Sequence, residues 1–67
     1  RREKLLKGLE GGPLTVYEAM KQLFARPSGF ELILMMSETL GNLEVLEDQG
    51  EIRREMHREQ IRFRRTH

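Results

Sequence analysis

Arginines recur near the C-terminal end of the sequence, where they are the residue type best suited to bind a ligand. Guanidinium groups match the geometry of phosphate, and an aromatic ring among them can stack on a base. The pattern therefore indicates a candidate contact with RNA or another single-stranded nucleic acid. Its residues are Arg53, Arg58, Arg62 and Arg64, which lie close to His57 and Phe63 in the sequence. Glutamates interrupt the run, and we favour the alternative of a solvated hairpin whose charges keep its edge strand from pairing with other molecules.

Residues that could catalyse a reaction or bind a metal ion are few. A zinc site needs three or four well-spaced His, Cys or carboxylate ligands, whereas the chain has two histidines, His57 and His67, and no cysteine. Ser28 and Ser37 have no nearby sequence partner that suggests nucleophilic activation. The glycines do not form a phosphate-binding loop, because the Lys-Ser/Thr ending is absent. We therefore predict no catalytic residue, no metal ligand and no cofactor in this chain.

Two capping boxes mark expected helix starts. In each box a hydroxyl residue precedes a glutamate by three positions, as in Thr15 with Glu18 and Ser28 with Glu31. Gly50 is a natural left-handed stop for the last helix. With the apolar periodicity, these signals predict helices over about 2–10, 15–25 and 28–49.

Alternating apolar positions follow the third helix and predict a β-hairpin over about 51–65. One face of this hairpin carries Ile52, Arg54, Met56, Ile61 and Phe63. Pairing Met56 with Ile61 puts the apolar residues of both strands on one buried face. The same register pairs Arg54 with Phe63 and Ile52 with Arg65. Because residues 57–60 include no Gly, Asn or Pro, we expect a four-residue loop there.

The order of these elements is that of a winged helix-turn-helix. We expect a mainly α fold with a small β-hairpin (α+β), in which three helices precede a two-stranded wing in a single domain, 1–67. The alternative is a three-helix bundle with a disordered basic tail, and the apolar alternation of the hairpin argues against it.

The third helix carries the wrong charge for reading duplex DNA. Residues 31–50 contain five acidic and no basic residues, a charge of −5, while residues 1–30 and 51–67 each carry +3. A helix in the major groove lies between phosphates and needs Lys or Arg there. We therefore expect no specific binding of duplex DNA through this helix.

The third helix also has more apolar surface than one core face needs. At about 100° per residue, one stripe collects on a single face and is the expected core side. Its members are Leu32, Met36, Leu40, Leu43 and Leu46. Leu34 and Val45 fall on the opposite side, with Ile33 and Met35 on the flanks. These four residues are our candidate face for packing on another domain or for forming a homodimer; the alternative is the apolar exposure usual in small domains.

The chain shows no targeting signal. It contains no apolar run long enough to span a membrane and no signal peptide, so we expect a cytoplasmic protein without a membrane partner. The sequence begins at Arg1 without an initiator Met, from which we expect an excised domain of a longer protein.

Several segments resemble a known domain. Residues 12–18 (GPLTVYE), 23–24 (LF) and 40–52 (LGNLEVLEDQGEI) resemble the winged-helix domain that follows the catalytic domain in some metallo-beta-lactamase-fold hydrolases. The resemblance spans residues 2 to about 56. Asn42 stands where that family often has His.

The resemblance implies an accessory domain that packs on the catalytic domain of a zinc-dependent hydrolase and shapes the approach of substrate. Zinc and its ligands belong to that preceding domain, and no residue of this chain matches its zinc-binding motif. Two alternatives stay open: a DNA-binding domain of a transcription regulator, and a free-standing protein-interaction or dimerisation module.

Overall fold

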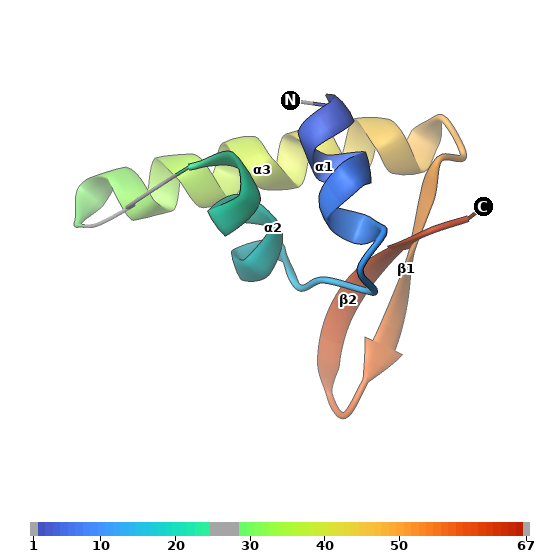
Figure 1. Ribbon diagram of the computed structural model, residues 1–67. Coiled ribbons are helices and arrows are strands. Elements are labelled where there is room, and N and C mark those ends of the chain that lie inside the picture. Colours follow the sequence, from blue (N-terminus) through green and yellow to red (C-terminus); the bar gives the residue numbers. More distant parts are fainter. Residues whose placement is uncertain (1, 25–28, 67) are drawn as a thin grey trace.

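The computed structural model describes residues 2–24 and 29–66, and within them it places three helices ahead of an antiparallel hairpin (Figure 1). The helices are α1 (Arg2–Leu9), α2 (Val16–Leu23) and α3 (Phe30–Asp48), and the strands are β1 (Ile52–His57) and β2 (Gln60–Arg65). The fold is the predicted winged helix-turn-helix of α+β class. Each helix is shorter than expected: Glu10 lies in a turn, Thr15 and Phe24 are the caps of α2, and Gly29 and Gln49 are the caps of α3. The predicted end residues 25 and 28 lie outside the described residues.

The start of α2 has the predicted capping box. The Thr15 N–H donates to Glu18 Oε1 at 2.9 Å, and the Glu18 N–H donates to Thr15 Oγ1 at 3.2 Å. The N-cap of α3 is Gly29, which makes no side-chain cap hydrogen bond, and the predicted cap Ser28 lies outside the described residues. Gly50 ends α3 with φ of 77°, as expected for a left-handed stop.

The wing has the predicted register and a different turn. Met56 pairs with Ile61, Arg54 with Phe63 and Ile52 with Arg65. The prediction of a four-residue loop was wrong, since His57 pairs with Gln60 and only two residues connect the strands. Both of these, Arg58 and Glu59, have positive φ, at 48° and 68°, which is the conformation of a type I′ turn. The additional backbone pairing of the strands outweighs the cost of this conformation for non-glycine residues.

The segment between α1 and α2 adds a third, minimal strand to the wing. The Leu14 N–H donates to the Phe63 carbonyl at 2.8 Å, and the Phe63 N–H donates to the Leu14 carbonyl at 2.7 Å. This bridge lies on the side of β2 away from β1, so β2 is the central strand. It fixes the wing to the helical body.

One hydrophobic core joins all the elements. It includes Leu5, Leu9, Ala19, Leu43, Leu46, Ile52 and Phe63. In Figure 1, α1 and α2 lie against α3, while the tip of the wing extends away from the three helices. The core therefore lies between the helices and the base of the wing.

The buried face of α3 differs from the predicted stripe. Leu43 and Leu46 are buried as predicted, but Leu40 is 36% exposed, and Thr39 is fully buried in its place. The Thr39 hydroxyl donates to the Met35 carbonyl at 2.8 Å, one helical turn earlier, which makes its burial acceptable. The core side of α3 is thus centred on Thr39, Leu43 and Leu46, and Leu40 lies at its edge.

Candidate functional site

The strand geometry divides the arginines of the wing between two faces. Arg53, Arg62 and Arg64 lie on the outer face, where Arg53 is directly opposite Arg64 and Glu55 is opposite Arg62. Arg54 and Arg65 share the inner face with Phe63 and Ile52. Arg58 lies in the turn. The arginines therefore do not form one continuous basic surface.

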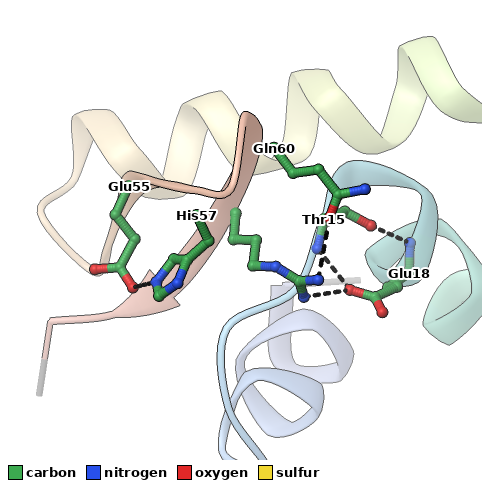
Figure 2. Close-up of polar contacts among 6 residues, drawn as sticks. Thr15, Glu18, Glu55, His57 and Gln60 are labelled. Carbon is green, nitrogen blue, oxygen red and sulfur yellow. Dashed lines mark hydrogen bonds and ion pairs between the residues drawn. The ribbon is translucent and has the colours of Figure 1, made fainter.

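Arg62 joins the wing to the start of α2. Its guanidinium donates to Glu18 Oε1 at 3.1 Å and to Gln60 Oε1 at 3.2 Å. The same Glu18 carboxylate accepts the Thr15 N–H, and this backbone hydrogen bond is the main cause that lowers the pKa of Glu18 below its ordinary value (Figure 2). The Glu18 carboxylate therefore takes part in the N-terminal capping of α2 and also binds Arg62 of the wing.

Arg54 joins the wing to α3. Its Nε and Nη2 atoms donate to the two carboxylate oxygens of Glu47, both at 2.8 Å. The guanidinium also lies over the Phe63 ring, 5.1 Å from its centroid. The hydrogen bonds from Arg54 lower the pKa of Glu47. This bidentate contact has a structural role, and it was not predicted from the sequence.

The outer face of the wing contains a second carboxylate cluster. Glu55 accepts a hydrogen bond from His57 at 2.7 Å (Figure 2), and this bond is the main cause that lowers the pKa of Glu55. The Glu55 carboxylate also lies 3.5 Å from the Arg64 guanidinium. Within residues 2–24 and 29–66, no hydrogen bond or ion pair engages Arg53 or Arg58. Of the four candidate phosphate contacts, Arg62 and Arg64 thus have carboxylate partners, and Arg53 and Arg58 face solvent.

The outer face of α3 combines apolar and acidic side chains. Ile33, Leu34 and Val45 are exposed by 61%, 58% and 54%, while Met35 is half-buried and contributes less to this surface. Phe30 was not predicted as part of the face, yet it is 76% exposed one turn before Leu34. Its spacing of four residues before Leu34 was the sequence signal that could have placed Phe30 on this face.

The tip of the wing is more exposed than predicted. The cross-strand pair Met56 and Ile61 is 65% and 44% exposed, although alternation placed it on the buried face. The reason is that the helices cover only the base of the hairpin, where Ile52 and Phe63 are buried. Pattern alone predicts the face of a strand correctly, but not how far the helices extend along it.

Two open depressions flank the wing. The larger, about 520 Å³, lies between the start of α2 and β2 and is lined mainly by Val16, Tyr17, Ile61 and the Glu18–Arg62 pair. The smaller, about 250 Å³, lies beside the loop after α1 and is lined in part by Glu10 and Arg65, which form an ion pair at 3.1 Å. The smaller depression is also lined by Arg64, whose carboxylate partner Glu55 lies outside it.

The described part of the chain shows no arrangement for metal chemistry and no membrane span. Among these residues, no group of three or more His, Cys, Asp or Glu side chains could hold a metal ion. No described helix combines the length and hydropathy needed to cross a bilayer. The most distinctive surface is therefore the apolar and acidic outer face of α3.

Comparisons with protein-family models, curated proteins and solved structures give no significant match to this chain. The functional argument therefore depends on the residues and their geometry.

Proposed function

We propose that this chain is a winged-helix accessory domain that docks on another protein domain through the outer face of α3. The observation that carries the proposal is the character of that face. In a DNA-reading winged helix this surface enters the major groove and needs basic residues. Here it has exposed Leu34 and Val45 beside glutamates, and no Lys or Arg occurs between Phe30 and Asp48.

The partner domain is the one that the resemblance implies: the catalytic domain of a zinc-dependent metallo-beta-lactamase-fold hydrolase. In that arrangement zinc and the catalytic residues belong to the partner, and this domain helps to shape the approach of substrate. The contact of Arg54 with Glu47 supports this role, because it holds the wing against the docking helix α3, and the contact of Arg62 with Glu18 joins the wing to α2.

The first experiment determines the intact mass of the native gene product with an antibody against this domain. A product several-fold heavier than 7.9 kDa supports the proposal, and zinc content and hydrolase activity are then measured in it. A product near 7.9 kDa overturns the hydrolase assignment.

A pair of substitutions then tests the docking face itself. Leu34→Glu and Val45→Glu change exposed residues, so in the isolated 67-residue chain each should alter the free energy of unfolding by only about 0.5 kcal/mol. In the longer product they should release the domain, detected as larger interdomain distances in small-angle scattering. Met56→Glu is the matched control, because Met56 is as exposed but lies on the wing. Equal behaviour of all three variants in the longer product would contradict docking through α3.

The transcription-regulator alternative makes the opposite prediction. It requires binding of duplex DNA that weakens steeply as salt rises. Such binding, abolished by changes on α3, would replace the proposed function.

A further inference from the structure

An exposed stripe runs along the outer face of α3 over about four turns. At about 100° per residue, Phe30, Gly41 and Val45 all lie within about 40° of Leu34 around the helix axis. The side chains of Phe30, Leu34 and Val45 are 76%, 58% and 54% exposed, and Gly41, which lies between Leu34 and Val45, is also exposed. The rise of 1.5 Å per residue gives the stripe a length of about 22 Å. A stripe of this length and width is suited to contact with a second helix that lies along α3.

Gly41 makes a notch in the stripe that the chain itself does not require. A Cβ atom at this position would have nothing within 4 Å, and Gly41 is not among the glycines with positive φ. Glycine in an exposed helix interior costs about 1 kcal/mol relative to alanine. Neither the packing nor the backbone of this domain explains the residue. A partner side chain or backbone that approaches the helix closely at this point does explain it.

Carboxylates border the stripe on both sides. Glu31 and Glu38 lie along one edge, and Glu44 and Asp48 lie along the other. All four residues are exposed, and α3 contains no basic residue. In a dimer that packs α3 against α3, the second copy would bring the same negative charges against them, and a nucleic acid or an anionic membrane would also be repelled. The charge of the border selects a basic protein partner.

We propose that this stripe binds a basic amphipathic helix, with a large apolar side chain seated over Gly41 and Lys or Arg residues facing the acidic borders. The inference rests on the proposed function, because it specifies which surface of the partner domain meets α3. Binding of an amphipathic helix through regularly spaced apolar anchors is an established mode of recognition. The borders supply specificity by excluding helices with acidic flanks.

The test is a selection from a displayed library of helical peptides. Each peptide has a fixed apolar ridge, and its flanking positions are varied among Lys, Arg, Gln, Glu and Asp. Binding to the 67-residue chain should enrich Lys and Arg at the flanks by about tenfold or more over Glu and Asp, as expected where like charges are excluded. Enrichment of neutral or acidic flanks, or no enrichment, overturns the proposal.

Variants of the chain locate the binding surface. Leu34→Glu should reduce binding of the selected peptides about tenfold or more, while Met56→Glu on the wing should leave it unchanged. Gly41→Leu should also abolish binding, because it fills the notch, and Gly41→Ala should have a smaller effect. Glu31→Lys combined with Glu38→Lys and Asp48→Lys should reverse the selected flanks to acidic residues. Circular dichroism of each variant establishes that it is folded, and a folded Gly41→Leu variant with unchanged binding overturns the role of the notch.

The result separates this inference from the proposed function. If Leu34→Glu releases the domain in the longer product but peptide selection shows no preference for basic flanks, docking through α3 stands and the basic helix is wrong. If Leu34→Glu has no effect in the longer product, the proposed function fails first.

Discussion

The two-residue turn of the wing holds both of its residues in the left-handed region. Arg58 has φ of 48° and Glu59 has φ of 68°. This conformation costs roughly 1–2 kcal/mol for a residue with a Cβ atom, and Asn-Gly is the pair that type I′ turns prefer. We predict that the double substitution Arg58→Asn and Glu59→Gly stabilises the folded chain.

The size of the effect follows from two opposing terms. Removing the backbone strain at both turn positions stabilises the folded chain by roughly 2 kcal/mol. The greater conformational freedom of glycine in the unfolded chain offsets roughly 0.5–1 kcal/mol of this gain. The net gain is about 1 kcal/mol. For a domain of this length that gain raises the melting temperature by about 7 °C. Net charge is unchanged, because the two substitutions remove one positive and one negative side chain.

Thermal unfolding followed by circular dichroism measures the change directly. Arg53→Asn is the matched control: it makes the same change of residue at an exposed strand position, where Asn is disfavoured, and it should lower the melting temperature slightly. A melting temperature of the double variant equal to or below that of the original chain would refute the reasoning. The turn would then have a different conformation in solution.

Three further perturbations test other parts of the structure. Phe63→Ala should cost about 3–5 kcal/mol, because the ring is 1% exposed in the core, and circular dichroism should show loss of the folded state in a domain this small. The hydrogen bonds from Arg54 lower the pKa of Glu47 in the folded chain. The ionised Glu47 therefore stabilises the fold fully above its ordinary pKa of 4.5, and this stabilisation is lost as the pH falls through the lowered value. Glu47→Gln should flatten the dependence of the unfolding free energy on pH in this acid range. Thr39→Val removes a buried hydroxyl bonded to the Met35 carbonyl and nearly preserves its volume; denaturant unfolding should change by no more than about 1 kcal/mol.

The local signals in the sequence predicted the elements and the register of the wing. The capping box at Thr15 and Glu18 involves residues three positions apart, so its geometry is set by local helix formation. The pairing of Met56 with Ile61 follows from alternation, because a slip of one residue would turn Ile52 and Phe63 away from the core. Both predictions depend on short-range patterns, and both are confirmed.

The features that the sequence did not predict depend on contacts between distant segments. Arg62 and Glu18 are 44 residues apart, and no periodicity indicates that they meet. The burial of Thr39 in place of Leu40 depends on how α3 is rotated against α1 and α2, which differs from the ideal stripe by only a fraction of a turn. The exposure of Met56 depends on how far the helices extend along the wing. Tertiary packing decides these outcomes.

The distribution of charge in this winged helix differs from the one expected of a domain that reads DNA. A nucleic-acid-binding wing would keep its arginines free for phosphates, but four wing arginines each contact a carboxylate: Arg54, Arg62, Arg64 and Arg65. These contacts join the wing to α3, to α2, to its own outer face and to the end of α1. Because one fold can serve many functions, the function of this domain must be argued from its exposed surface. Four of the wing arginines are thus engaged within the domain, whereas the apolar, acid-bordered face of α3 is exposed, and this contrast is why we propose that α3 binds a partner.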